Sequence, residues 1–206
     1  MLRIFSVVVA CLAFGALLAS WGSGLPLRPG VVAAVLLVGG ALWMKRHWAR
    51  RRLVAGDDPS AAERNLWIYL AGTALIVGYV LVVLVTPGSE VHRETGGTGG
   101  YDSWLMLGGG AIAWFLLYER GAPRDERDQA NAAYGDRVGY WALVLLLIVF
   151  LLALGFAPRD LMQRFTHWLI ANSLLCLIML ACLVQYVAQL ARYGSERRLD
   201  ETAQHG

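Results

Sequence analysis

The sequence predicts an all-α integral membrane protein: a six-helix transmembrane bundle, built as three helical hairpins, with both termini in the cytoplasm. Of its 206 residues, 57% are hydrophobic and only 16% are charged, and the mean hydropathy is +0.51. Ordinary soluble domains carry about 25% charged residues. The apolar residues form six blocks, and the charged residues lie between these blocks. We therefore expect residues 1–206 to form a single transmembrane domain.

The lengths of the apolar blocks define the predicted spans. A helix needs about 20 apolar residues to cross roughly 30 Å of hydrocarbon, because lipid cannot hydrogen-bond to an exposed backbone. The six spans cover residues 4–20, 31–44, 66–86, 103–118, 138–157 and 165–191. The second and the fourth are short. They cross only if Lys45, Arg46 and Glu119 extend toward the headgroups, or if the bilayer thins locally.

The distribution of basic residues predicts the orientation of these spans. Short loops rich in Lys and Arg stay on the cytoplasmic side. With six spans, fourteen of the 18 basic residues fall on one side: Arg3, Lys45, Arg46, Arg50, Arg51, Arg52, Arg64, Arg120, Arg124, Arg127, Arg137, Arg192, Arg197 and Arg198. The other side holds Arg28, Arg93, Arg159 and Arg164. This bias predicts that both termini lie in the cytoplasm.

The first apolar block has an alternative interpretation as a signal peptide. Arg3 precedes an apolar run that ends near the small residues Ala19 and Ser20. A basic start, an apolar core and a small-residue cleavage site are the features of such a peptide. Its cleavage would leave five spans and an external N-terminus. The run is long for the apolar core of a signal peptide, so we favour a retained span.

Local signals predict where several helices begin and end. Asp58 followed by Pro59 predicts a capped start for the third span, and Pro87 with Gly88 predicts its end. In the next cytoplasmic loop, residues 123–135 are expected to form a short surface helix that Pro123 starts and Gly135 ends. Asp136 is then expected to cap the fifth span.

Small residues predict the contact seams between helices. In lipid, close approach of backbones supplies much of the contact energy between helices. Cys11, Gly15 and Ala19 are spaced by four on the first span, and Ala74 and Gly78 are spaced likewise on the third. Small residues also occur at 39–41 and 108–110 within the second and fourth spans. The glycines at 108–110 alternatively allow the fourth span to bend or break, as in many transporters.

Known catalytic constellations are missing from the sequence. It contains no His-Glu-x-x-His motif, and its three cysteines form no Cys-x-x-Cys pair. The glycine-rich residues 94–100 lack the Lys and the Ser or Thr of a phosphate loop. His92 and His167 fall on the same side, but one lies in a loop and the other beside Trp168. We therefore expect no catalytic residue, no cofactor and no bound metal.

Uncharged polar residues are concentrated in the sixth span. Gln185 and Gln189 share a face near its cytoplasmic end, whereas His167, Asn172 and Ser173 lie near its outer end. These five residues either hydrogen-bond between helices or line a small polar cavity. No charged residue falls at the centre of a span, which argues against a pump that works through a buried carboxylate.

A basic segment follows the second span directly. Its cations are Lys45, Arg46, Arg50, Arg51 and Arg52. Such a segment binds anionic lipid headgroups with about 1 kcal/mol per cation, although it also fixes the topology by itself. Nucleic acid is not an expected partner, because the segment is held at the membrane.

The cytoplasmic loop before the fifth span resembles a known pattern. Residues 125–128 read Asp-Glu-Arg-Asp, and residues 133–140 read Ala-Tyr-Gly-Asp-Arg-Val-Gly-Tyr. This stretch is similar to a motif in uncharacterised small multi-pass membrane proteins of bacteria. The resemblance covers about 30 residues. It implies a bacterial inner-membrane location and no particular activity.

Two functions are compatible with these observations. The first is a non-enzymatic accessory or regulatory subunit that docks a membrane or cytoplasmic protein partner through Arg124, Asp125, Glu126 and Arg127. The second is a small solute-binding or permease component of a transporter, for which the polar residues of the sixth span line a cavity. A membrane enzyme is a third and weaker alternative.

Overall fold

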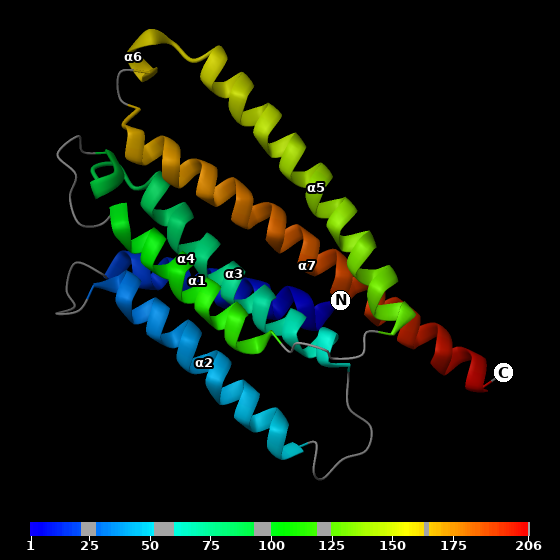
Figure 1. Ribbon diagram of the computed structural model, residues 1–206. Coiled ribbons are helices and arrows are strands. Elements are labelled where there is room, and N and C mark those ends of the chain that lie inside the picture. Colours follow the sequence, from blue (N-terminus) through cyan, green and yellow to red (C-terminus); the bar gives the residue numbers. More distant parts are fainter. Residues whose placement is uncertain (22–27, 52–59, 93–99, 119–124, 163–164, 206) are drawn as a thin grey trace.

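The computed structural model is an all-α bundle (Figure 1). It describes residues 1–21, 28–51, 60–92, 100–118, 125–162 and 165–205. Within these ranges the long helices are α1 (Leu2–Trp21), α2 (Pro29–Arg51), α3 (Ala61–Val85), α4 (Gly100–Leu117), α5 (Glu126–Gly155) and α7 (His167–His205). Two short elements, η1 (Glu90–His92) and α6 (Arg159–Met162), lie between them. Each predicted span is therefore a helix.

The long helices alternate in direction along the chain, so both termini lie at the same end of the bundle (Figure 1). At this end α1, α3 and α5 begin, and α2, α4 and α7 end. The basic residues that are predicted to be cytoplasmic, and that fall in the described segments, lie at this end. We call it the basic end. In Figure 1, α5 runs away from the basic end and α7 runs back toward it, and the two antiparallel helices are in contact.

Five of the long helices are long and apolar enough to cross a membrane. They are Leu2–Ser20, Pro29–Trp48, Ala61–Val85, Glu126–Gly155 and His167–Glu196. The second of these is longer than the predicted span of residues 31–44. Helix α4 has 18 residues, including Asp102 and four glycines, and it is not among the five. The fourth predicted span is thus confirmed as a helix, while its crossing stays a prediction.

Helix α3 lies at the centre of the packing. It contacts α1, α7 and α4, while α2 packs mainly against α4 and α5 mainly against α7. Leu70, Ala74, Val77 and Val80 of α3 are almost completely buried. Consecutive helices α1 and α2 barely touch. Of the three predicted hairpins, α5 with α7 is a closely packed pair and α3 with α4 is in contact, whereas α1 packs mainly on α3 and α2 packs mainly on α4.

The contact between α1 and α3 depends on two glycines. A β-carbon on Gly15 would collide with the backbone of Leu75, and one on Gly78 would collide with the backbone of Leu12. This confirms the predicted seam of small residues on the first and third spans. On the other pair of helices, Gly109 of α4 lies directly against Ala34 of α2.

The glycine run of α4 serves packing and does not interrupt the helix. Helix α4 is continuous from Gly100 to Leu117. A β-carbon at Gly108 would meet nothing within 4 Å, and the same holds for Gly39 and Gly40 of α2. The alternative of a bent or broken fourth span is therefore not seen, and Gly109 is the residue of the run that needs to be small.

The helix ends differ in part from the prediction. Ser60 caps α3, since its side chain accepts a hydrogen bond from the Glu63 amide at 3.1 Å, whereas residues 58 and 59 lie outside the described residues. The predicted end of α3 is confirmed: the helix stops at Val85, and Gly88 takes a φ of 81°. The left-handed conformation at that turn suits glycine.

The predicted break at Gly135 is wrong. Helix α5 runs unbroken from Glu126 through Gly135 and Asp136, and Asp125 caps it by accepting a hydrogen bond from the Glu126 amide at 2.7 Å. Gly135 is buried inside the helix, where it faces the side chain of Gln189. Glycine occurs here because α7 approaches α5 closely. A contact between two helices cannot be predicted from the local signals that end a helix.

Candidate functional site

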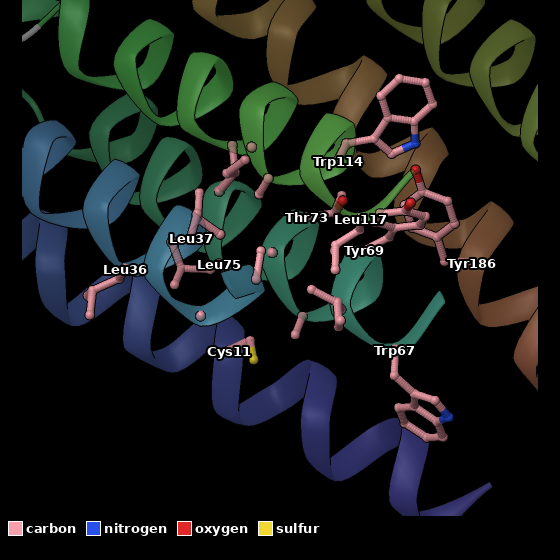
Figure 2. Close-up of a pocket in the computed structure, with 18 of the residues that line it drawn as sticks. Cys11, Leu36, Leu37, Trp67, Tyr69, Thr73, Leu75, Trp114, Leu117 and Tyr186 are labelled. Atoms are coloured by element: carbon pink, nitrogen blue, oxygen red, sulfur yellow. The ribbon is translucent and has the colours of Figure 1, made fainter. Parts of the chain in front are cut away.

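Two adjoining cavities occupy the half of the bundle toward the basic end. The larger has a volume of about 600 Å³, is lined by residues of α1, α2, α3, α4 and α7, and is partly open to the surface of the bundle. Figure 2 shows its lining side chains, which include Cys11, Leu37, Thr73, Trp114 and Tyr186 from those five helices. Its walls are almost entirely apolar. We call it the apolar cavity.

The smaller cavity lies between α3, α4, α5 and α7 and has a volume of about 300 Å³. Its walls are half polar, and they carry carboxylates, amides and aromatic rings. These side chains are Asn65, Tyr69, Trp114, Tyr118, Asp128, Asp136, Gln185, Tyr186, Gln189 and Tyr193. We call it the polar cavity.

Three aromatic residues, Tyr69, Trp114 and Tyr186, line both cavities. The rings of Tyr69 and Tyr186 lie 5.9 Å apart, centroid to centroid, with an angle of 41° between their planes. They come from α3 and α7, and Trp114 comes from α4. The two cavities therefore meet at a junction with aromatic walls, where an apolar space adjoins a polar one.

Two stripes of side chains face each other across the contact of α5 and α7. Asp128, Ala132 and Asp136 are spaced by four on α5, and Gln185, Gln189 and Tyr193 are spaced by four on α7. Residues four apart lie on one face of a helix. Both stripes line the polar cavity, so its walls follow directly from the helical repeat.

The carboxylates of these stripes are held by neutral donors. Asp128 is buried, and its Oδ1 accepts hydrogen bonds from the Ser60 hydroxyl at 3.1 Å and from the Tyr193 hydroxyl at 2.5 Å. Asp136 Oδ1 accepts a hydrogen bond from Gln185 Nε2 at 2.6 Å. These bonds fix both carboxyl groups without neutralising their charge.

Two glycines of α5 leave space for two glutamine side chains of α7. A β-carbon on Gly135 would collide with the side chain of Gln189, and one on Gly139 would lie 2.9 Å from Gln185 Cβ. Gln189 is only 6% exposed. Its amide makes no hydrogen bond to any residue in the part of the chain that the structure describes. The glycines thus bring two amides against α5 at the wall of the polar cavity.

A charged cluster closes the contact of α5 and α7 beyond the cavity. Glu196 accepts hydrogen bonds from Arg127 Nε at 2.7 Å, from Asn131 Nδ2 at 3.1 Å and from Arg192 Nε at 3.3 Å. The guanidinium of Arg127 also lies over the ring of Tyr193, 5.7 Å from its centroid. The cluster joins the first turns of α5 to the later part of α7 at the basic end of the bundle.

The predicted lipid-binding segment lies at the end of α2. Lys45 Nζ donates a hydrogen bond to the Leu116 carbonyl at 2.9 Å, which helps to satisfy the last carbonyls of α4. Arg46 and Arg50 are exposed. The side chain of Arg51 and the whole of Arg52 lie outside the described residues. Binding of anionic headgroups to this segment stays a prediction.

The predicted docking residues lie at the start of α5. Asp125 caps the helix, Glu126 is exposed and Arg127 pairs with Glu196. Arg124 lies outside the described residues. Two of the three described side chains therefore have roles within the protein itself. Docking of a partner through this segment stays a prediction.

The five residues proposed for a polar cavity separate into two groups. Gln185 and Gln189 line the polar cavity, whereas His167, Asn172 and Ser173 are not part of the described lining of either cavity. Asn172 is fully buried and donates a hydrogen bond to the Trp168 carbonyl at 2.9 Å, one turn earlier in its own helix. The end of α7 opposite the basic end is packed there against η1.

Sequence reasoning missed the carboxylates and most of the aromatic residues of the site. The prediction places Asp128 in a separate short surface helix and Asp136 at the cap of the fifth span, so it does not put the two carboxylates on one face of a single helix. One signal was available in the sequence: the four-residue spacing of Asp128, Ala132 and Asp136 continues without a break into the apolar part of α5. Tyr69 and Tyr186 become site residues only through the contact of α3 and α7.

The described residues contain no group of three or more His, Cys, Asp or Glu side chains that could hold a metal ion. Comparisons of the chain with protein-family models, with curated proteins and with solved structures gave no match. The likeness of residues 125–140 to bacterial membrane proteins therefore stays a prediction. The five long apolar helices are typical of a multi-pass membrane protein.

Proposed function

We propose that this chain is a multi-pass membrane protein that binds an amphiphilic molecule, with the apolar part in the apolar cavity and the headgroup in the polar cavity. This is the solute-binding alternative, narrowed to one class of solute. The observation that supports it most strongly is the aromatic junction of Tyr69, Trp114 and Tyr186, which line both cavities. One molecule with an apolar and a polar end fits such a pair of spaces.

The size and lining of the cavities support binding. Small-molecule sites usually have volumes of about 300 to 1,000 Å³ and mainly apolar walls with a few convergent polar groups. The apolar cavity, at about 600 Å³, lies within this range. Protein interiors are otherwise close-packed, and an apolar cavity attracts apolar occupants more readily than water.

The proposed orientation places the site in the cytoplasmic half of the membrane. The excess of Lys and Arg at the basic end favours a cytoplasmic position for that end. We propose that all six long helices cross, since α4 packs along α2 and continues the alternation of directions (Figure 1). The headgroup would then lie near the cytoplasmic surface and the apolar part deeper in the bilayer.

Quenching of tryptophan fluorescence tests binding of an apolar chain. Trp67 and Trp114 line the apolar cavity. The probe is 11-bromo-1-undecanol, whose bromine quenches a tryptophan on contact, added to the purified chain in lipid nanodiscs. We expect a saturable component of quenching on top of the linear component that partition into the bilayer produces.

Two matched double glycine variants distinguish binding of the probe in the apolar cavity from its partition into the lipid bilayer. A β-carbon at Gly40 would meet nothing within 4 Å, and Gly110 has only the end of Ile76 at 3.4 Å. Both glycines line the apolar cavity, so Gly40→Leu with Gly110→Leu should fill it and remove the saturable component. Gly39→Leu with Gly108→Leu adds the same atoms outside the cavity lining and should preserve that component. Equal quenching of both double variants would refute the proposal.

A further inference from the structure

We propose that the polar cavity selects a cationic headgroup of the ammonium type, with Asp136 as its direct counter-ion. This inference rests on the proposed function, because it specifies the headgroup of the amphiphile. Three independent features of the polar cavity carry it: the sign of its charge, its aromatic walls and a buried amide without a partner.

The charge of the cavity wall is negative. Asp128 and Asp136 line the cavity, and no Lys, Arg or His belongs to its described lining. The nearby cation Arg127 is paired with Glu196, and its guanidinium lies over the Tyr193 ring. Sulfate, phosphate or carboxylate headgroups would face two carboxylates here, whereas a cation would be attracted by both.

Asp136 is placed for direct contact with the headgroup. It lies about two helical turns farther from the basic end than Asp128. This separation is about 12 Å along α5, at 1.5 Å per residue. At this level α7 contributes Gln185 and Tyr186, and Tyr186 belongs to the junction with the apolar cavity. Only Oδ1 of Asp136 accepts a hydrogen bond from a described residue, so Oδ2 can accept one from an ammonium group.

Aromatic rings form much of the remaining wall. Tyr69, Trp114, Tyr118, Tyr186 and Tyr193 all line the polar cavity. The faces of such rings attract ammonium ions, and aromatic cages are a recurrent way to bind alkylated amines. An aromatic wall next to a carboxylate therefore suits an amine that carries a long apolar substituent.

Gln189 supplies a polar group that is available to a bound headgroup. Its side chain lines the cavity, is more than nine-tenths buried, and has no hydrogen bond within the described residues. Its carbonyl oxygen can accept a hydrogen bond from an ammonium, so a bound headgroup would complete the hydrogen bonding of this amide.

A headgroup series with one common chain tests this inference. The probes are (11-bromoundecyl)trimethylammonium, its primary amine analogue, 11-bromo-1-undecanol and 11-bromoundecanoic acid, each titrated into wild-type protein in nanodiscs of neutral lipid. We expect the two cations to show at least about tenfold tighter saturable quenching than the alcohol, as one charge-assisted contact provides. The acid should bind more weakly than the alcohol.

Charge-removing variants locate the selectivity. In Asp136→Asn the amide oxygen can still accept the hydrogen bond of Gln185, so the fold should be kept while the cation preference falls about tenfold. Binding of 11-bromo-1-undecanol should not change in this variant. Glu126→Gln, at an exposed residue outside the cavity lining, is the matched control and should keep the full preference.

The outcomes separate the two proposals. Equal affinity for cations and alcohol, or an unchanged cation preference in Asp136→Asn, would overturn the headgroup inference while leaving amphiphile binding intact. Tightest binding of the acid would overturn it too, and would point to the basic segment at the end of α2. If no probe shows a saturable component that Gly40→Leu with Gly110→Leu removes, the proposed function itself fails.

Discussion

Tyr69 of α3 and Tyr186 of α7 meet with ring centroids 5.9 Å apart at the boundary between the apolar and the polar cavity. The residues are 117 positions apart in the sequence, and the antiparallel contact of α3 with α7 brings them together. Both rings face a hydrocarbon-like space on one side and carboxylates and amides on the other. This relationship makes the two cavities one candidate site.

Two buried amides of α7 should respond differently to the same substitution. Gln189→Leu removes a polar group from the wall of the polar cavity and should weaken binding of (11-bromoundecyl)trimethylammonium by about five- to tenfold, through loss of one hydrogen bond. Asn172→Leu should leave binding unchanged, because Asn172 is not part of the described lining of either cavity. Titration by tryptophan quenching measures both. A larger loss in Asn172→Leu would place the site at the other end of the bundle.

Close packing of α1 on α3 should make both contact glycines intolerant of a methyl group. Gly15→Ala and Gly78→Ala each place a β-carbon against the backbone of the opposite helix, which should lower the free energy of unfolding by about 1 to 3 kcal/mol. Unfolding in a graded mixture of mild and denaturing detergent, followed by circular dichroism, measures this. Gly39→Ala has open space and should unfold like wild type or slightly later. Equal midpoints for Gly15→Ala and Gly39→Ala would show that the helices are farther apart.

Glu196 should contribute more to stability than its partner Arg127. Glu196→Ala leaves the fully buried Asn131 amide without an acceptor, which should cost about 1 to 3 kcal/mol. The Arg127 side chain is 42% exposed, so Arg127→Ala should cost less than about 1 kcal/mol, as exposed ion pairs usually do. The same detergent unfolding compares the two. A larger loss of stability in Arg127→Ala than in Glu196→Ala would contradict this prediction.

The proposed orientation predicts which loop ends are accessible from outside. In a background with the three native cysteines replaced by Ala, Arg159→Cys should react with a membrane-impermeant maleimide on intact bacterial spheroplasts. Glu126→Cys should react only after lysis, because the basic end is expected in the cytoplasm. Both positions are exposed in the structure, so access to the side chain is matched. Labelling of Glu126→Cys alone before lysis would invert the topology.

The helices could be predicted from the sequence because each apolar block is a local property. The seam of Gly15 and Gly78 was also predictable, since spacing by four places small residues on one face. The helices against which α1 and α2 pack could not be predicted from the sequence. Consecutive helices do not have to be the closest neighbours, and the preference of α1 for α3 depends on the fit of backbone to backbone at two glycines.

The site was only partly predictable for a related reason. The spacing of Gln185 and Gln189 indicated a polar face on the last helix, and the structure places both on the polar cavity. The sequence predicted Asp128 in a separate surface helix and Asp136 at the cap of the next helix, because Gly135 between them has the features of a helix end. Its true role is to admit Gln189 from α7, and that contact depends on two segments more than 50 residues apart.

The most direct test of amphiphile binding in the joined cavities is native mass spectrometry of the protein released from nanodiscs with an equimolar mixture of the bromoundecyl ammonium, alcohol and acid probes. The mass added to the chain identifies which probe forms each adduct. We predict one dominant adduct per chain, carrying the ammonium probe, in wild type and in Gly39→Leu with Gly108→Leu, and its loss in Gly40→Leu with Gly110→Leu. Adducts of all three probes in equal amounts, unchanged when the apolar cavity is filled, would contradict the account.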